Sequence, residues 1–209
     1  MSLVISCSHP LIATMLSSLR SKATAPPEFR RLVRSLARMI AQDATADLPT
    51  RDVEVETPLG KAPGKVIAHP VRIIPILRAG LGMAEGVLDL IPDAEVWHLG
   101  LRRDEETLLP EEYYRKLPDG RGPDATVLVV DPMLATGGSA VHACKLLKRA
   151  GSHRLKFLTL IAAPEGIARL SGAMPDLTIH VGVIDERLNE RGYIVPGLGD
   201  AGDRLYATS

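Results

Sequence analysis

The spacing of apolar and polar residues changes along the chain, and this change predicts where helices and strands lie. Within residues 1–50, apolar residues recur every three or four positions, as in amphipathic helices. The two apolar series are Leu11, Met15 and Leu19, and then Leu32, Leu36, Met39 and Ile40. Pro26-Pro27 separates the two series. We therefore expect residues 1–50 to form a helical N-terminal segment that covers part of the core.

A different pattern begins after Pro49, where the residues Val53 to Glu56 alternate between apolar and charged. Two glycines, Gly60 and Gly64, punctuate the chain before it returns through Lys65 to Ala68. Alternation with a period of two is typical of a strand, and glycines favour turns. This stretch therefore predicts a hairpin.

From Val71 onward, runs of consecutive apolar residues alternate with turns and with helix candidates. The expected strands are Val71–Leu77, Ala94–Leu101, Thr126–Val130, Lys156–Ile161 and Leu177–Ile184, and the expected helices are Met83–Leu90, Ser139–Ala150 and Glu165–Ser171. Strands that are apolar on both faces and alternate with helices indicate a parallel sheet covered on both sides. The sequence thus predicts an α/β fold with a doubly wound, mostly parallel sheet and flanking helices. Ligands are expected at the carboxyl ends of its strands.

Two segments do not follow this alternation. Residues 102–122 are polar and charged, contain Tyr113-Tyr114, and are too long for an ordinary connection. We expect them to form a lid or a projecting β-arm. Residues 186–209 are rich in glycine and lack a helical or strand period. They are expected to form an irregular cap, or hood, over the site.

Length, charge and cysteine content narrow the class of protein. A chain of 209 residues suits one domain, so we expect 1–209 to be a single domain with its α/β core at 71–185. The 25 basic residues balance the 25 acidic ones, so a broad cationic surface is not expected. We therefore do not expect a nucleic-acid partner. No apolar run approaches the roughly 20 residues of a membrane helix, and no basic segment precedes the first apolar residues. A cytoplasmic protein without a membrane partner is expected.

Metal-binding and disulfide patterns are weak. Cys7 and Cys144 lie far apart, and the six histidines show neither a pair four residues apart nor a link to a cysteine. A zinc site is therefore not expected, and both cysteines are expected to be free thiols. Asp185 and Glu186 are adjacent carboxylates, but neighbouring side chains usually point apart, so a structural role is expected for them.

Candidate chemistry first appears where the buried strand Thr126–Val130 ends. The strand delivers Asp131 to its carboxyl end, and Ala135–Ser139 then opens a helix. Backbone N–H groups, two hydroxyls and the helix dipole converge there, and the glycines allow close approach of an anion. A carboxylate beside a phosphate needs another partner, and sugar hydroxyls are suitable. The residues therefore favour a sugar phosphate, although the same residue types also serve as ordinary helix caps.

Other phosphate-binding motifs fit less well. The Walker pattern fails because no lysine follows the glycines at 137 and 138. Residues 197–202 formally match G-x-G-x-x-G, but we expect no strand running into them and too few residues after them to form the required helix. Gly80-Leu81-Gly82 lies in a better context, yet Gly86 falls one position late. A dinucleotide site is therefore not favoured.

The segment Val129–Ser139 resembles the signature for 5-phosphoribosyl 1-diphosphate (PRPP) in type I phosphoribosyltransferases: a hydrophobic strand, an acidic residue and a Thr-Gly-Gly loop. Most members carry two adjacent acidic residues, whereas Pro132 occupies the second place here. This form is similar to that of the uracil phosphoribosyltransferases. Three further segments resemble the same group: Ile76–Gly80, Arg102–Thr107 and Gly192–Arg204.

The resemblance implies transfer of the phosphoribosyl group of PRPP to N1 of uracil, giving UMP and diphosphate. The PRPP-binding residues that it implies are Arg78, Arg103, Asp131, Pro132, Met133, Leu134, Ala135, Thr136, Gly137, Gly138, Ser139 and Asp200. Those implied for uracil are Ile194, Gly199, Asp200 and Ala201. Asp131, Arg103 and Asp200 are the expected catalytic residues. Resemblance alone selects Arg103 over Arg102.

The same resemblance implies the cofactor and the partners. Mg²⁺ is expected to bind mainly through PRPP, with no strong protein ligand and with Asp200 as the nearest candidate. A homodimer or homotetramer and a GTP effector are also expected. Two alternatives stay open: a transferase of the same class acting on another base, and a regulator that keeps the fold but binds RNA. The balanced charge counts against the regulator.

Overall fold

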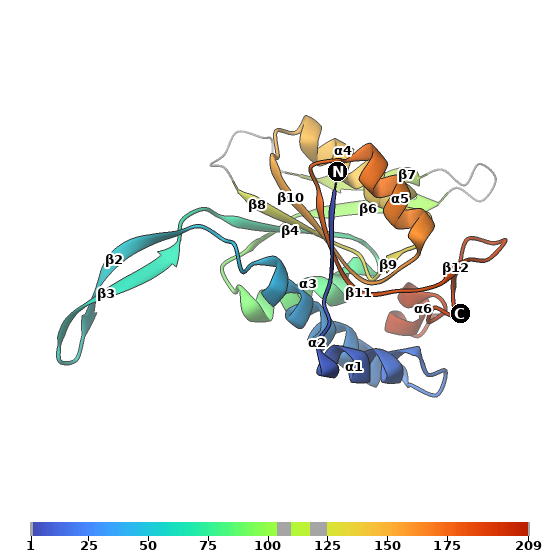
Figure 1. The fold of residues 1–209 in the computed structure, drawn as a ribbon, viewed down its shortest axis with the longest axis horizontal. Coiled ribbons are helices and arrows are strands. Elements are labelled where there is room, and N and C mark those ends of the chain that lie inside the picture. Colours follow the sequence, from blue (N-terminus) through green and yellow to red (C-terminus); the bar gives the residue numbers. More distant parts are fainter. Residues whose placement is uncertain (1, 104–109, 118–124, 209) are drawn as a thin grey trace.

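The computed structural model describes residues 2–103, 110–117 and 125–208, and its centre is one sheet (Figure 1). The strands of this sheet are β1 (Leu3–Ser6), β4 (Val71–Leu77), β5 (Glu95–Val96), β6 (His98–Arg103), β7 (Pro110–Lys116), β8 (Thr126–Val130), β9 (Met133–Leu134), β10 (Arg154–Ala162) and β11 (Thr178–Ile184). Its main path runs β1-β11-β10-β8-β4-β6-β7, while β5 pairs with β4 and β9 with β10. Neighbours along the path are parallel except β6 and β7.

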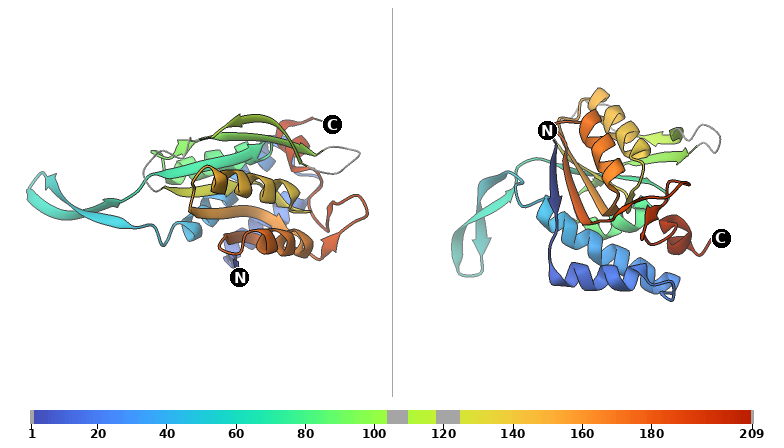
Figure 2. Two further views of the ribbon diagram at one scale, coloured as in Figure 1. Left: turned by 90° about the horizontal axis from the view of Figure 1, so that it is seen from above. Right: turned by 45° about the vertical axis from the view of Figure 1, so that its right-hand side comes forward.

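Helices cover both faces of the sheet (Figures 1 and 2). One face carries α1 (Pro10–Arg20), α2 (Pro26–Ala44) and α3 (Gly80–Leu90), and the other carries α4 (Gly138–Arg149) and α5 (Pro164–Ala173). Two apolar cores result, one beneath each layer of helices. The buried positions of α2 include Leu32, Leu36 and Ile40, which follow the helical spacing of its sequence. The expected α/β fold with flanking helices is confirmed.

The order of the core strands indicates the end of the sheet at which a ligand is expected to bind. In chain order, the five core strands β4, β6, β8, β10 and β11 are arranged 2-1-3-4-5. The winding direction therefore reverses between β4 and β8. Ligands in open α/β sheets bind outside the carboxyl ends of the strands at such a point. The segments that follow β4 and β8 are the first place to look for a site.

The projecting arm lies in a different segment from the one expected. Strands β2 (Thr50–Thr57) and β3 (Gly60–Ile67) form the predicted hairpin, which extends far from the body of the molecule (Figures 1 and 2). Of residues 102–122, which were expected to form a lid or a projecting β-arm, the described ones lie mainly in β6 and β7, which pair antiparallel at the edge of the sheet. An edge strand with mostly polar side chains has little apolar period by which to recognise it. Residues 104–109 and 118–124 lie outside the described part.

Both ends of the chain contain regular elements that were not predicted. Leu3–Ser6 is a strand paired with β11, although residues 1–50 were expected to be helical. The hood contains β12 (Arg187–Leu188) paired with β13 (Ile194–Val195), followed by helix α6 (Ala201–Tyr206). The expectation of an irregular hood was therefore wrong. These elements have two to six residues, which is too short to show a period.

The bounds of single elements and the state of the cysteines can also be compared with the predictions. Strand β8 has its predicted bounds, whereas α3 begins at Gly80 rather than Met83. Contrary to the two reasons given against a dinucleotide motif at residues 197–202, the two-residue strand β13 ends at Val195 and a helix of six residues begins at Ala201. Cys7 and Cys144 are free and buried. In the described part of the chain, no helix has the length and apolar character needed to cross a membrane.

Candidate functional site

Asp131 follows the central strand β8 at the point where the sheet changes winding direction. All five residues of β8 are buried, and the N–H of Asp131 donates to the carbonyl of Leu158 at 3.2 Å. Burial raises the pKa of Asp131 to about 7; a hydrogen bond from the Met133 backbone lowers it, and the charge of Asp200 raises it. The carboxyl therefore changes charge near neutral pH. In its ionised form it can accept hydrogen bonds from hydroxyl groups.

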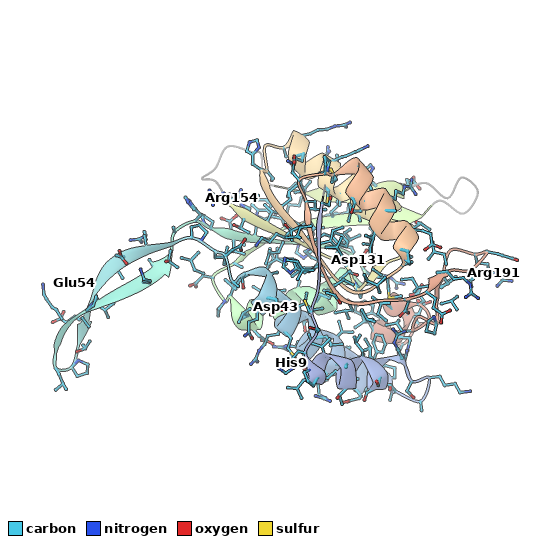
Figure 3. All side chains as sticks on the ribbon, viewed as in Figure 1. His9, Asp43, Glu54, Asp131, Arg154 and Arg191 are labelled. Carbon is cyan, nitrogen blue, oxygen red and sulfur yellow. The ribbon has the colours of Figure 1, made fainter. Side chains whose placement is uncertain are left out.

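Asp131 is far from the arm. Figure 3 shows its side chain within the body of the molecule, whereas Glu54 lies out on the β2–β3 hairpin. Asp131 as a whole is partly accessible, although its carboxyl is surrounded by protein atoms. The arm and the candidate site around Asp131 therefore lie in different parts of the molecule.

The loop after Asp131 forms an anion cradle. Strand β9 pairs with β10, so the chain turns at Ala135 and enters α4 at Gly138. Gly137 has φ of 75°, a left-handed conformation that favours glycine. The N-terminus of α4 has no side-chain cap. Its N–H groups are therefore available to a phosphate, as expected for the segment 135–139.

Helix α5 supports this cradle from behind. A Cβ on Gly137 would lie 2.8 Å from the carbonyl oxygen of Gly166, and a Cβ on Gly166 would lie 2.3 Å from that of Ala135. Arg169 also donates to the carbonyl of Thr136 at 3.4 Å. The loop and the start of α5 are in close backbone contact, so glycine at both positions is needed for the packing.

Arg78 lies at the end of the adjacent strand, β4. Its backbone follows a cis peptide bond between Leu77 and Arg78, and its side chain is 56% exposed. The next turn packs against β8, because a Cβ on Gly80 would lie 2.5 Å from the carbonyl oxygen of Val130. The two predicted residues Arg78 and Asp131 therefore follow neighbouring strands at the same sheet edge.

The hood meets Arg78 through α6. Arg78 Nη2 lies 3.4 Å from Asp203 Oδ1, and Tyr206 Oη donates to the carbonyl of Arg78 at 3.2 Å. Asp200 caps α6 by accepting from the N–H of Asp203 at 2.9 Å. A Cβ on Gly202 would lie 3.3 Å from Asp200 Oδ1 and 3.9 Å from Arg78 Nη2. Asp200 therefore lies close to Arg78, and its charge also reaches Asp131.

The residues expected for uracil differ in their accessibility. Ile194 and Ala201 are buried at 5% and 4% exposure, whereas Gly199 and Asp200 are exposed. Gly199 has φ of 85°. Gly199 and Asp200 therefore form an exposed turn between the buried residues Leu198 and Ala201, and this turn is accessible to a ligand.

Comparison with known proteins agrees with this geometry. The sequence model described as uracil phosphoribosyltransferase matches residues 5–208. The chain belongs to the uracil phosphoribosyltransferase family. A uracil phosphoribosyltransferase of Symbiobacterium thermophilum is 54% identical over 209 residues, covering 100% of both chains. One from a Geobacillus species is 55% identical over 201 residues and covers 96% of each.

Solved structures agree with the fold. A protein of Aquifex aeolicus superposes with a TM-score of 0.94 at 39% identity, covering 99% of each chain. A hypoxanthine phosphoribosyltransferase of Staphylococcus aureus gives a TM-score of 0.53 at 13% identity, covering 84% of this chain and 82% of its own. The second similarity concerns the fold alone. This chain therefore has a fold similar to that of the Staphylococcus aureus protein.

The structure gives less information about Arg103 and about the ligands of Mg²⁺. Arg103 is the last residue of β6 and pairs with Pro110, but its side chain lies outside the described part. No group of three or more His, Cys, Asp or Glu side chains that could hold a metal occurs within the described residues. Asp131 and Asp200 supply two nearby carboxylates. This donor set fits a cation that arrives with a ligand's own phosphate oxygens.

Sequence reasoning missed several contacts of the site. Asp203 and Tyr206 contact Arg78 across separations of 125 and 128 residues. Arg20 pairs with Asp185 across 165 residues. No local pattern distinguishes these side chains from surface residues. Asp185 does have the expected structural role, because it also accepts from the N–H of Gly197 at 2.8 Å.

Proposed function

We propose that this chain transfers the phosphoribosyl group of PRPP to N1 of uracil, giving UMP and diphosphate. One structural relationship supports it most: Asp131 and Arg78 follow adjacent strands at the switch point, beside the uncapped N-terminus of α4. A carboxylate, a guanidinium and an anion cradle match the ribose, the diphosphate and the 5′-phosphate of PRPP respectively. Membership of the family supports the choice of uracil.

We assign the parts of PRPP to this edge as follows. The N–H groups of residues 135–139 hold the 5′-phosphate, and the preceding residues 132–134 line the ribose. Asp131 accepts hydrogen bonds from the ribose hydroxyls. Arg78 and Arg103 bind the diphosphate, since a guanidinium can contact phosphate oxygens with two N–H groups at once. Asp200 contacts PRPP directly or through the waters of Mg²⁺.

The reaction then depends on positioning and electrostatics. The bond between C1′ and the diphosphate oxygen breaks as the bond between C1′ and N1 of uracil forms, and the proton of N1 passes to water or to the departing diphosphate. Positive charge develops on the ribose ring, and negative charge grows on the diphosphate. Asp131 holds the ribose in place, while the arginines stabilise the leaving group. No protein nucleophile is required.

Mg²⁺ belongs to this proposal as a cofactor bound mainly by PRPP. When bound, it supplies positive charge to the diphosphate oxygens. Asp200 is the protein carboxylate best placed to contact it or its waters. Its Oδ1 already caps α6, so Oδ2 is the oxygen that we assign to this contact.

We assign uracil to the backbone of the hood at Ile194, Gly199 and Ala201. A fixed N–H facing O4 and a fixed C=O facing N3–H pair with uracil. Cytosine would place a donor against a donor and an acceptor against an acceptor. Discrimination by such buried hydrogen bonds reaches about 10⁴-fold. Closure of residues 102–122 over the ribose, which would exclude water, remains a prediction.

An activity assay tests the proposal against its alternatives. The protein is incubated with PRPP, Mg²⁺ and one free base at a time, and the nucleotide formed is identified by mass. UMP from uracil is the expected product. A nucleotide formed only from another base would favour a transferase of different specificity. No turnover together with RNA binding that weakens steeply with salt would favour a regulator.

Assembly, effector and location are further parts of the proposal. The β2–β3 arm extends away from the body of the molecule and exposes Val55, Leu59, Val66 and Ile67, of which Leu59 is fully exposed. Such apolar side chains favour contact with another copy, in line with a homodimer or homotetramer. Sedimentation velocity with and without GTP tests the assembly and the effector together. A cytoplasmic location is consistent with the proposed salvage of free uracil.

A further inference from the structure

A buried ion pair connects the N-terminal helices to the hood. Arg20 is the last residue of α1, and its guanidinium donates through Nη1 to Asp185 Oδ2 at 2.8 Å and through Nη2 to Asp185 Oδ1. The side chain of Asp185 is 4% exposed and that of Arg20 is 24% exposed. A carboxylate removed from water in this way is stabilised by its partner, and loss of the partner would leave a buried charge without compensation.

The pair closes a ring of hydrogen bonds on one residue of the hood. Arg20 Nη1 donates to the carbonyl of Gly197 at 2.8 Å, and the N–H of Gly197 donates to Asp185 Oδ2 at 2.8 Å. Both polar groups of Gly197 are therefore held by the same ion pair. We call Arg20, Asp185 and Gly197 the hood clamp.

A second arginine holds the next residue of the hood. Arg204 on α6 donates to the carbonyl of Leu198 at 2.8 Å and to that of Ser21 at 2.6 Å. Its guanidinium also lies 4.4 Å from the centre of the Phe29 ring. The carbonyls of residues 197 and 198 are thus both bonded to arginines, and both arginines reach the end of α1. The hood clamp and Arg204 together attach residues 197 and 198 of the hood to the end of α1.

Glycine makes this attachment necessary. Gly197 and Gly199 have φ of 59° and 85°, and a Cβ on Gly197 would lie 2.2 Å from the carbonyl oxygen of Ile194. Other residues do not fit this turn, but glycine has more conformational freedom to lose than any other residue. Without external bonds the turn would populate many conformations. Ligand affinity falls in proportion to the fraction of molecules in the competent conformation.

We infer that Arg20 and Asp185 are positioning residues for the pyrimidine base. The inference rests on the proposed function, which places uracil against Ile194, Gly199 and Ala201. These residues lie on both sides of Gly197 along the chain. The clamp fixes Gly197 from a helix that contributes no assigned ligand contact, and it thereby presents the backbone groups of Gly199 and Ala201 in one arrangement. Arg20 and Asp185 act through the loop and do not touch the reacting atoms.

The test measures uracil and PRPP separately. In Arg20→Gln, the KM for uracil is expected to rise about tenfold, since the loss of charge-assisted bonds lowers the competent fraction of the loop. The KM for PRPP should rise less than that for uracil, because the cradle for the 5′-phosphate has its own support from α5 and only Asp200 of the assigned PRPP contacts lies in the hood. Arg20→Lys keeps the positive charge but cannot donate to both carboxylate oxygens of Asp185 as the guanidinium does. Its KM for uracil should therefore lie between those of the unaltered protein and Arg20→Gln.

A matched control is available on the same face of the molecule. Arg34 on α2 forms a forked pair with Asp89 on α3 and lies 3.8 Å from Glu85, and none of its ion pairs among the described residues involves the hood. Arg34→Gln should leave both KM values within about twofold of the unaltered protein. Melting temperatures of all variants show whether a kinetic change follows loss of stability.

The outcomes separate the two proposals. If the unaltered protein forms no UMP, the proposed function is wrong and the inference is overturned with it. If it forms UMP but the uracil and PRPP KM values of Arg20→Gln rise together or not at all, the positioning role alone is overturned. Should Arg20→Gln fail to fold, Asp185→Asn keeps the shape and one oxygen acceptor. The same selective rise in uracil KM is required of it.

Discussion

The guanidinium of Arg78 lies 3.4 Å from the carboxylate of Asp203, so a residue assigned to the diphosphate is paired with a residue of the hood. Both side chains are about half exposed, at 56% and 43%. Because a diphosphate and this carboxylate would compete for the same guanidinium, PRPP must displace the pair or share Arg78 with it.

Asp203→Asn should therefore bind PRPP more tightly. An exposed ion pair is worth about 0.2–1 kcal/mol, so the KM for PRPP should fall by up to about fivefold. Steady-state kinetics at varied PRPP measures it. Thr208→Ala is the control, since it removes the 2.7 Å bond from Thr208 to Asp203 and leaves the pair with Arg78. A higher PRPP KM in Asp203→Asn would mean that Asp203 helps to orient Arg78.

The raised pKa of Asp131 predicts a pH dependence of PRPP use. Burial raises this pKa to about 7, so the carboxyl becomes neutral as pH falls and accepts fewer bonds from ribose hydroxyls. Below pH 7, kcat/KM for PRPP should approach a tenfold loss per pH unit. Asp131→Asn should have low activity without this titration. Full activity in that variant would remove Asp131 from the mechanism.

The same pKa predicts how stability varies with pH. The ordinary pKa of 3.8 applies to the unfolded chain, whereas the folded value is about 7, so the folded state binds this proton more tightly. The contribution of Asp131 to stability is therefore present at low pH and is lost as pH rises through this window. Chemical denaturation of Asp131→Asn should show a gain over the unaltered protein at pH 8 that is absent at pH 4.

Two glycines on α5 provide a matched test of the phosphate cradle. A Cβ on Gly166 would lie 2.3 Å from the carbonyl oxygen of Ala135, whereas a Cβ on Gly172 meets nothing within 4 Å. Gly166→Ala should move the cradle, raise the KM for PRPP at least about tenfold and lower stability by about 1–3 kcal/mol. Gly172→Ala should be neutral or stabilising by up to about 1 kcal/mol. Similar effects of both changes would argue against contact between cradle and helix as the cause.

The first residue of α6 tests the base site. Ala201 is 4% exposed and packs into the core, so Ala201→Leu overpacks the position beneath the backbone to which uracil is assigned. The KM for uracil should rise by about tenfold or more, with a smaller change in the KM for PRPP, since overpacking costs about 1–3 kcal/mol at the site of insertion. Isothermal titration with UMP provides an independent measurement. Unchanged affinity for uracil and UMP would show that the hood does not bind the base.

The sequence by itself determined the central sheet and the candidate cradle. Strand β8 and the core strands around it were predicted because burial on both faces leaves an uninterrupted apolar run. Asp131 and the glycines at 137–138 were recognised because a strand end, a turn and a helix start are adjacent in the chain. Resemblance then supplied the base, which these local signals do not encode.

Only the tertiary structure decided how distant segments complete the site. Three elements show no clear recurrence of apolar residues and could not be predicted: the polar edge strand β7, the short strand β1 and helix α6. The pairs of Arg78 with Asp203 and Arg20 with Asp185 span 125 and 165 residues. Such partners are selected by the folded geometry rather than by neighbouring residues. Physically, local propensity acts within one element, whereas burial and charge pairing act between elements that folding brings together.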